Sequence, residues 1–207
     1  LVVTALLPER TGLWVGTNRG AWFLGEQATH LGEKQGVPPQ AIYAFATDSE
    51  QRIWIATANG LVLLDAARQR ALSVFLNPGP GRPFLCLQAG ADGQMWAGTL
   101  NSGLFRFNPA DSTWTALTEP DGLPHPHVRC LLHDPDGQLW IGTSGGGLAK
   151  LTNQPFRHFD QTSGLSGNRI YALHEDRGGR LWLAVSHNGL QVLDMSGFHA
   201  FERDSGY

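Results

Sequence analysis

Apolar and polar residues alternate along this chain in short runs that glycine, proline and aspartate interrupt. Residues 127–159 show the pattern most clearly, with turns at Pro135–Gly137 and Ser144–Gly146. The runs around these turns are His127–Asp134, Gln138–Thr143, Gly147–Thr152 and Phe156–Phe159. Short alternating runs bounded by turn residues are typical of β-strands, and Asp-Gly accepts the positive φ of a tight turn. The pattern predicts four antiparallel strands, which we call A to D, and no helix beyond a single turn.

The same pattern recurs along the whole chain. Five tryptophans mark it, each in the middle of a strand B and 40 to 44 residues from the next: Trp14, Trp54, Trp96, Trp140 and Trp182. A repeat of this length indicates a stack of similar units that bury their apolar faces against each other. Strands A and B are the most apolar, whereas strand D carries Arg157 and His158. This gradient predicts a propeller blade with strand A at the central axis and strand D at the rim.

The chain is therefore predicted to be an all-β β-propeller of four-stranded antiparallel blades, with one segment covering residues 1–207. The five expected blades are residues 1–36, 37–78, 79–122, 123–164 and 165–207. The tryptophans should be buried between blades, and the Gly or Ala two positions after each should make room for the next blade. This expectation is made for Trp54, Trp96, Trp140 and Trp182.

Strand A has a small position of its own. Cys86 and Cys130 occupy it where Ala44 and Ala172 stand in other blades. We predict that both cysteines are free and buried. A disulfide between adjacent blades is the alternative, and two thiols alone make a poor metal site.

Three segments of this chain are similar to a known repeat pattern. His133–Leu148 matches its pattern closely, His174–Trp182 and the linker Asp121–Leu123 match well, and the first copy is weakest, at Arg10–Gly12. These phrases resemble the two-component regulator propeller repeat, and the resemblance covers the whole chain. Asp134–Trp140 is also similar to the Asp-box of sialidase-type propellers. That motif has Thr directly before the tryptophan, where this chain has Leu, Ile or Met, so we set it aside.

The resemblance implies a periplasmic or extracellular sensor region of a bacterial inner-membrane receptor. In that family a histidine kinase or diguanylate cyclase output domain lies beyond a membrane helix, and several members are associated with sensing carbohydrate. Family propellers usually have seven blades or more. Since the chain opens inside a strand A and closes on a linker-like segment, we expect five blades of a larger propeller. Their apolar flanks would pair with further blades or a second copy, and a closed five-bladed ring is the alternative.

Charge and hydropathy narrow the partners further. The formal net charge is −3, so no general attraction to nucleic acid or an anionic membrane surface is expected. The chain has no apolar stretch near 20 residues, so direct membrane insertion by this segment is not expected.

Function is expected where the repeats differ. The D-to-A linkers and B-to-C turns share one face of such a sheet, and their sequences are irregular. The candidate ligand-binding residues on this face are Arg19, Arg82, Asn101, His127, Arg129, Arg169 and His187. Arg, Asn and His in a depression bind hydroxyls or carboxylates through directed hydrogen bonds. Trp22 and Tyr171 would add stacking surface if they are exposed.

Competing explanations exist for several of these residues. Asparagine favours left-handed geometry in turns, which would account for Asn18, Asn59, Asn101 and Asn188 without a ligand. Arg129 and Arg169 are predicted to be equivalent residues at the start of strand A, where either a ligand or pairing between blades would use them.

Metal binding and catalysis find little support. In His125-Pro126-His127 the proline separates the two rings and no carboxylate pair completes a site, so we predict a solvated linker and no metal. No Ser-His-Asp arrangement, activated cysteine or phosphate-binding loop stands out, and no cofactor is expected.

We therefore predict a non-catalytic sensor segment that recognises an oligosaccharide or another small polar ligand. The alternatives are a lectin-like propeller with one site per blade, a protein-interaction or dimerisation scaffold, and an enzyme such as a propeller lyase. A lectin-like propeller would need the same polar residues in each blade, and the candidates differ from blade to blade.

Overall fold

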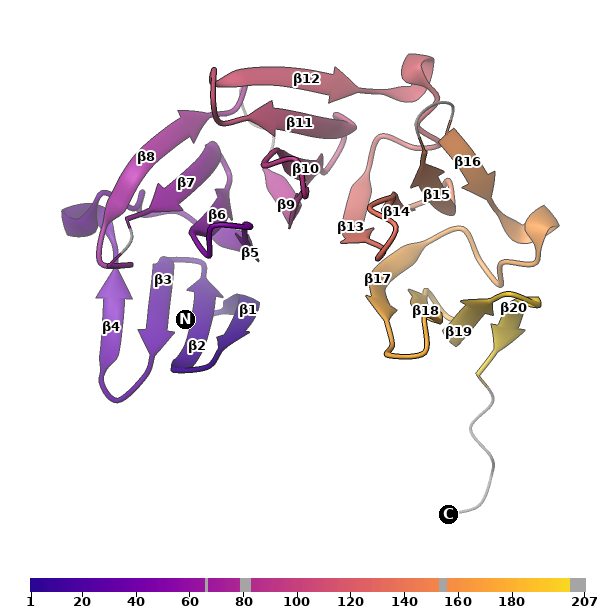
Figure 1. Cartoon of the computed structure of the whole chain (residues 1–207), viewed down its shortest axis with the longest axis horizontal. Coiled ribbons are helices and arrows are strands. Elements are labelled where there is room, and N and C mark those ends of the chain that lie inside the picture. The colour runs from indigo at the N-terminus through magenta and orange to yellow at the C-terminus, as the bar shows by residue number, and fades with distance from the viewer. Residues whose placement is uncertain (66, 79–82, 153–155, 202–207) are drawn as a thin grey trace. The chain divides into compact units, whose positions relative to one another are not determined.

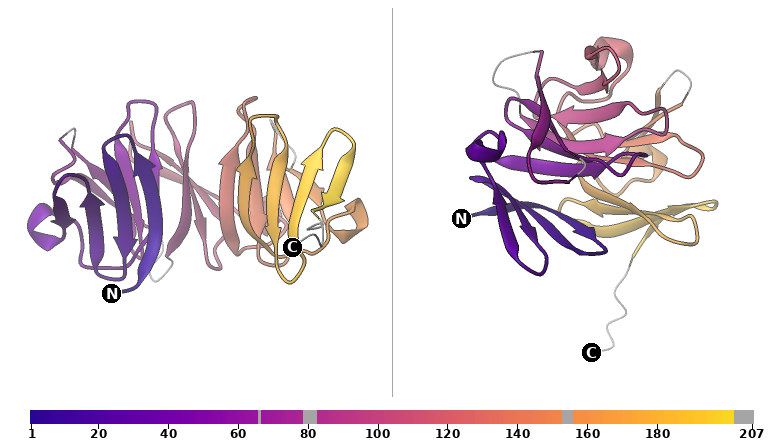
Figure 2. Two further views of the ribbon diagram at one scale, coloured as in Figure 1. Left: turned by 90° about the horizontal axis from the view of Figure 1, so that it is seen from below. Right: turned by 60° about the vertical axis from the view of Figure 1, so that its left-hand side comes forward.

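The computed structural model describes residues 1–65, 67–78, 83–152 and 156–201. These residues form five four-stranded antiparallel sheets, each with its strands in chain order (Figure 1). In Figure 2 the neighbouring strands of the first sheet (indigo) and of the last sheet (yellow) can be followed from one to the next. The predicted all-β propeller of four-stranded blades is confirmed.

Helical structure in the described residues is limited to single turns between sheets. The three 3-10 turns are η1 (Glu33–Gln35), η2 (Glu119–Asp121) and η3 (Gln161–Ser163). Each ends at a glycine with positive φ, which lets the chain turn into the next strand A: Gly36, Gly122 and Gly164. No helix in this part of the chain is long and apolar enough to cross a membrane.

The described chain packs as two compact units. The first comprises Leu1–Leu100 and Phe105–Ala116, and the second comprises Asn101–Leu104 and the described residues from Leu117 onward.

Three sheets lie chiefly in the first unit. The first sheet consists of β1 (Val3–Glu9), β2 (Gly12–Thr17), β3 (Gly20–Leu24) and β4 (Ala28–Leu31). The second consists of β5 (Ile42–Thr47), β6 (Ile53–Thr57), β7 (Gly60–Leu64) and β8 (Ala71–Leu76). The third consists of β9 (Phe84–Ala89), β10 (Met95–Thr99), β11 (Leu104–Asn108) and β12 (Thr113–Leu117).

Two sheets form the second unit. The fourth sheet consists of β13 (Val128–His133), β14 (Leu139–Thr143), β15 (Leu148–Leu151) and β16 (Phe156–Phe159). The fifth consists of β17 (Ile170–Glu175), β18 (Leu181–Val185), β19 (Gly189–Asp194) and β20 (Gly197–Ala200). The first strands of both sheets, β13 and β17, lie next to each other, which places strand A at the inner edge of each blade.

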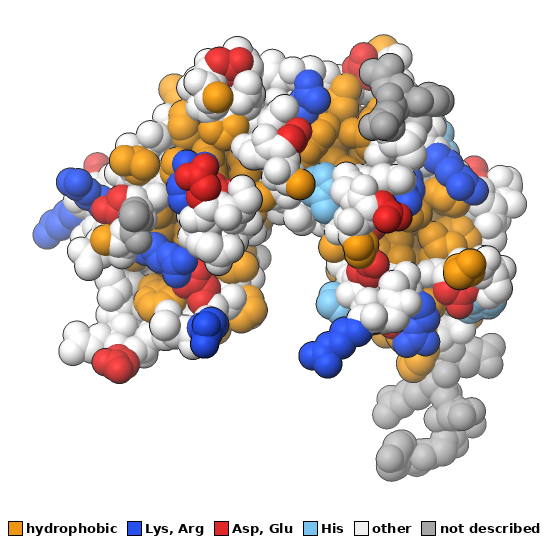
Figure 3. All heavy atoms as spheres, viewed as in Figure 1, with side chains coloured by type: hydrophobic (Ala, Val, Ile, Leu, Met, Phe, Trp, Pro, Cys, Tyr) orange, Lys and Arg blue, Asp and Glu red, His pale blue; other side chains and the backbone are white. Residues whose placement is uncertain are grey.

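Burial peaks in strands B and C, and not in strands A and B as the sequence suggested. All residues of β6 and β7 are buried, whereas β13 alternates between buried and half-buried residues and β8 between half-buried and exposed ones. The reason is that strand A is an edge strand, so only its neighbouring strand and the adjacent blade cover it. On the face shown in Figure 3, acidic and basic side chains are interspersed around the apolar ones.

The repeated tryptophans fill the space between consecutive sheets. Trp54 is fully buried and its ring centroid lies 6.1 Å from that of Phe107 in the third sheet. Trp140 is 8% exposed and joins a core with Ile170, Leu181 and Leu183 of the fifth sheet. Trp96 is also buried. Burial between two sheets is therefore confirmed for Trp54 and Trp140, and burial alone for Trp96.

Trp182 departs from this expectation because it is half-buried. It belongs to the last sheet of the second unit, and among the described residues of that unit no further sheet covers its ring. Phe201 packs against it instead, with ring centroids 5.2 Å apart.

An aspartate six residues before the tryptophan holds the indole in three of the sheets. Trp54 Nε1 donates to Asp48 Oδ2 at 2.8 Å, and the same bond joins Trp140 to Asp134 at 3.1 Å and Trp182 to Asp176 at 2.9 Å. The carboxylate also accepts backbone N–H groups of the A-to-B turn, such as Arg52 N to Asp48 Oδ1 at 2.9 Å. The aspartate thus joins the turn to the inter-blade core. The first and third sheets have Pro8 and Gly90 at this position.

Small residues allow neighbouring sheets to approach closely, as predicted. A methyl group added to Gly16 would lie 2.9 Å from Cγ2 of Ile42 in the second sheet, and one added to Gly142 would lie 2.9 Å from Cγ2 of Ile170 in the fifth. Gly142 pairs with Cys130, and the added methyl group would also clash with the Cys130 Sγ.

Both cysteines of strand A pair with a glycine of strand B, as Ala5 of the first sheet also does. Cys86 pairs with Gly98 and Cys130 with Gly142, whereas Ala44 pairs with Ala56 and Ala172 with Ala184. The larger thiol is therefore accommodated by a glycine opposite it.

The cysteines are thiols, but both are half-buried and not fully buried as predicted. Their place on an edge strand explains the difference. Burial of the Cys130 sulfur still raises the pKa of its thiol to about 12, so the group stays protonated and unreactive at neutral pH.

We predict that Gly142→Ala lowers the free energy of unfolding by about 1–3 kcal/mol, because the added methyl overpacks the contact with Cys130 and Ile170. The double variant Gly142→Ala/Cys130→Ala should recover part of this loss, since it recreates the Ala–Ala pair of the fifth sheet. Denaturant unfolding of the two variants checks this. Equal losses in the single and double variants would show that the Cys–Gly pairing is not the cause.

Candidate functional site

Every strand A has a β-bulge close to its first residue. The pairing register shifts between Val128 and Cys130 in the fourth sheet and between Ile170 and Ala172 in the fifth. The extra residues are therefore Arg129 and Tyr171. A bulge re-aims the side chain of its extra residue, and such bulges are frequent beside functional sites.

The side chains at this bulge differ between sheets. In the second unit the bulged residues are Arg129 and Tyr171. The residues two positions before them are His127 and Arg169. The same two positions are occupied by Val2 and Thr4 in the first sheet, by Ala41 and Tyr43 in the second, and by Pro83 and Leu85 in the third. At these two positions, all of them described, an arginine occurs only in the fourth and fifth sheets.

Register corrects one expectation from the sequence. Arg129 and Arg169 are not equivalent: Arg129 corresponds to Tyr171, and Arg169 corresponds to His127, because the Val128–Thr143 and Ile170–Val185 pairs align. Strands β13 and β17 therefore carry different side chains at the bulge, and Arg129 lies against Tyr171.

We call one group of five polar residues the edge cluster: His127, Arg129, Arg169, Tyr171 and Ser186. The Arg129 guanidinium carbon lies 4.7 Å from the centroid of the Tyr171 ring, which is a cation–π contact. Ser186 Oγ donates to the Tyr171 hydroxyl at 3.5 Å. Hydrogen bonds from Ser186 and Arg169, together with the positive charges of Arg129 and Arg169, lower the pKa of the Tyr171 hydroxyl. Tyr171 is 46% exposed, so its ring also faces solvent.

His127 lies beside the two arginines and is half-buried. Burial lowers the pKa of its imidazole, and the positive charges of Arg129, His125 and Arg169 lower it further. The ring is therefore neutral at neutral pH. Its backbone N–H donates to His125 Nδ1 at 3.1 Å, so His125 closes the linker turn. Both histidines are half-buried, so this linker is less solvated than the sequence suggested.

Two nitrogens of the edge cluster are buried without a hydrogen-bond partner among the described residues. They are Nε of Arg129 and Nε2 of His127. Buried polar groups are nearly always satisfied, and those that are not call for an explanation such as a missing ligand.

The other candidate residues lie elsewhere. Arg19 belongs to the first unit, where it is exposed in the turn after β2, and Asn101 is exposed in the turn after β10. His187 is exposed in the turn after β18 with a φ of 63°. Arg82 lies outside the described residues. The edge cluster thus unites three of the candidates, His127, Arg129 and Arg169, with Tyr171, while Trp22 is half-buried against His30 at 4.6 Å.

Left-handed turn geometry does not explain the asparagines. Positive φ in the B-to-C turns occurs at glycine and at His187, and Asn18, Asn59, Asn101 and Asn188 do not have it. Asn18 instead pairs with the start of strand A, since its Oδ1 accepts Val2 N at 3.1 Å. Asn188 Nδ2 similarly donates to Ser166 O. These asparagines tie the turn to the preceding linker.

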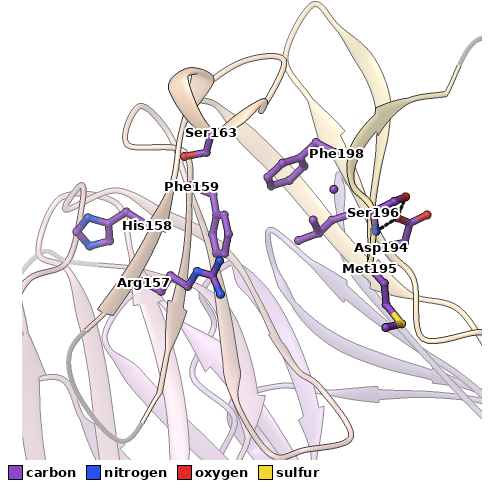
Figure 4. A pocket seen from close by; sticks show the side chains of 10 residues that line it. Arg157, His158, Phe159, Ser163, Asp194, Met195, Ser196 and Phe198 are labelled. Atoms are coloured by element: carbon purple, nitrogen blue, oxygen red, sulfur yellow. Dashed lines mark hydrogen bonds between the residues drawn. The ribbon is translucent and has the colours of Figure 1, made fainter.

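A groove that the sequence did not indicate lies at the rim of the second unit, between β16 and the β19–β20 hairpin. Figure 4 shows Phe159 and Phe198 from the two sides of this groove, with Arg157 beside Phe159. Met195 is fully exposed at the hairpin. Ser196 Oγ donates to Asp194 Oδ1 at 2.6 Å, so the polar groups of this hairpin satisfy each other.

A family comparison matches three segments of the chain. The sequence model described as "two component regulator propeller" matches residues 36–59, 122–145 and 164–187. These segments contain Trp54, Trp140 and Trp182, the tryptophans whose indole donates to an aspartate. Comparison with curated protein sequences gave no match.

Solved structures share the fold. An extracellular domain described as part of a hybrid two component system from B. thetaiotaomicron is 23% identical, with a TM-score of 0.80 over 100% of this chain and 29% of that chain. A second such domain from the same organism is 21% identical, with a TM-score of 0.77 over 92% of this chain and 27% of that chain. Virginiamycin B lyase from Staphylococcus aureus is 14% identical, with a TM-score of 0.79 over 99% of this chain and 71% of that chain. The chain thus spans less than a third of either receptor domain.

Proposed function

We propose that this chain, which is built from two component regulator propeller repeats, is a ligand-sensing region of a bacterial signalling receptor outside the cytoplasmic membrane. Three repeat matches and the similar fold of two extracellular receptor domains support the proposal. The region itself is non-catalytic, and a histidine kinase or diguanylate cyclase in the same receptor would supply the output.

The edge cluster is the observation that carries the proposal. Residues that recur in every blade serve packing, whereas an arginine stands at the bulge position only in the fourth sheet. Two buried nitrogens without a partner among the described residues, Arg129 Nε and His127 Nε2, belong to this same cluster. We propose that a small polar ligand binds there and that its binding is the sensed event.

The topology is tested in the full-length receptor in cells. An epitope inserted into the exposed turn Ala110–Ser112 should be cleaved by protease added to cells with a permeabilised outer envelope, while a cytoplasmic marker stays intact. An epitope that is cut only after the inner membrane is lysed would contradict the proposed location.

We predict that Arg129→Gln/Arg169→Gln abolishes the response of the full-length receptor to its inducing growth condition, because both guanidinium groups of the edge cluster are lost. Output is measured with a transcriptional reporter, and receptor abundance by immunoblot. The matched control is Arg106→Gln, which removes an arginine stacked on Trp96 in the first unit. An unchanged response in the double variant would reject the sensing role of the edge cluster.

A further inference from the structure

The arginines of the edge cluster lack acidic partners, in contrast to four other arginines of this chain. Carboxylates pair with four arginines elsewhere: Arg52 with Asp48, Arg68 with Glu9, Arg70 with Asp65 and Arg180 with Asp176. No ion pair in the described residues includes Arg129 or Arg169. Arg129 is half-buried and Arg169 is exposed, and no carboxylate of the described residues neutralises either charge.

Two nitrogens of the edge cluster are available to a ligand. Arg129 places one face of its guanidinium on Tyr171, and this contact leaves the edge of the guanidinium plane, with its N–H groups, free to donate. Its Nε is buried without a partner, as is Nε2 of His127. The neutral imidazole carries one proton, and with Nε2 protonated it is a further donor of the edge cluster.

We propose that the edge cluster binds the carboxylate group of a small organic acid, with Arg129 and Arg169 as ion-pair partners and His127 as a hydrogen-bond donor. This inference rests on the proposed function, because it names the ligand class of that same site. The carboxylate would supply the negative charge that the protein itself does not place beside these arginines.

Carboxylate suits the cluster better than other anions for two reasons. Its two oxygens match the planar fork of a guanidinium, which gives two parallel N–H···O bonds. The exposed ring of Tyr171 lies beside that fork and offers an apolar face to the carbon body of an organic acid, which a bare inorganic anion lacks. A neutral ligand would leave both positive charges uncompensated.

The test compares acids with their neutral isosteres. Purified chain is titrated with benzoate, benzamide, acetate, acetamide and sulfate at constant ionic strength, and binding is followed through ¹H–¹⁵N chemical shifts. Benzoate and acetate should cause saturable shifts around His127, Arg129 and Arg169, and the two amides should not. We expect Arg129→Gln and Arg169→Gln each to weaken benzoate binding about 10–100-fold, as loss of a hydrogen bond to a charged group does.

Controls separate this inference from the proposed function. Arg106→Gln should leave the benzoate affinity unchanged, and Arg129→Lys, which keeps the charge but not the fork, should weaken it even if Arg129→Gln does not fold. Equal binding of benzamide would overturn the carboxylate inference while a polar ligand site survives. Equal binding of sulfate would reduce the cluster to a general anion site and overturn it as well. Absence of any saturable shift with all five probes would also overturn the inference, whereas the receptor location and signalling tests would stand on their own results.

Discussion

Trp140→Ala should lower the free energy of unfolding of the second unit by about 3–5 kcal/mol, the usual loss when a large core aromatic is truncated. The ring fills the space between the fourth and fifth sheets, against Ile170, Leu181 and Leu183. Its removal also leaves the Asp134 carboxylate without the indole N–H that donates to it at 3.1 Å. Denaturant unfolding, followed by far-ultraviolet circular dichroism, measures the loss.

Trp182→Ala is the matched control for this change. Its indole makes the same bond to an aspartate, but the ring is half-buried, so less apolar surface returns to water on unfolding. We expect a distinctly smaller loss than for Trp140. Equal losses would mean that burial between two blades is not what makes these tryptophans stabilising.

Asp48→Ala should lower the free energy of unfolding by about 3 kcal/mol. The substitution leaves the buried indole N–H of Trp54 without an acceptor, and it also removes the acceptor of the backbone N–H groups in the A-to-B turn. Asp48 accepts hydrogen bonds from Glu50 N, Arg52 N, Arg52 Nε and Trp54 Nε1. Asp92→Ala is a suitable control, since that exposed aspartate lies in the matching turn of the third sheet and accepts Gln94 N at 3.1 Å. Chemical unfolding at neutral pH measures both losses.

The dependence on pH gives this prediction a second check. Burial opposes ionisation of Asp48, but hydrogen bonds from Trp54 and Arg52 outweigh it and lower the pKa of the carboxyl. A lowered pKa in the folded state adds stability above the unfolded pKa of about 4, and this contribution is lost as the pH falls through the folded pKa. The difference between the wild type and Asp48→Ala should therefore shrink below about pH 4. A constant difference down to acid pH would show that the charge of Asp48 contributes nothing.

The blade architecture could be predicted because it depends on local, repeated signals. Each Asp-Gly turn, each alternating run and each central tryptophan specifies one piece of a meander, and the repetition removes ambiguity between helix and strand. The room that Gly16 and Gly142 leave for the next sheet also followed from the repeat. Burial of Trp182 could not be predicted in this way, because it depends on what covers the last sheet and not on the repeat itself.

The edge cluster was only partly predictable. His127, Arg129 and Arg169 were identified as polar residues on the irregular face of the D-to-A linkers, but the sequence does not show that a bulge re-aims Arg129 and Tyr171. The mistaken equivalence of the two arginines had a detectable signal, because Arg129 and Tyr171 both stand 11 residues before their tryptophans. Ser186 and the rim groove depend on side-chain packing between sheets, for which the repeat gives no pattern.

The most direct test of ligand recognition at the edge cluster is the side-chain Nε–H signal of Arg129 in ¹H–¹⁵N spectra, recorded with and without saturating benzoate. Because this nitrogen is buried and has no partner in the described residues, a bound carboxylate should shift its proton downfield and slow its exchange with water. The Nε–H of Arg106 should not respond. If the Arg129 signal stays unchanged while benzoate shifts resonances elsewhere, the edge cluster is not the ligand-binding site of this propeller.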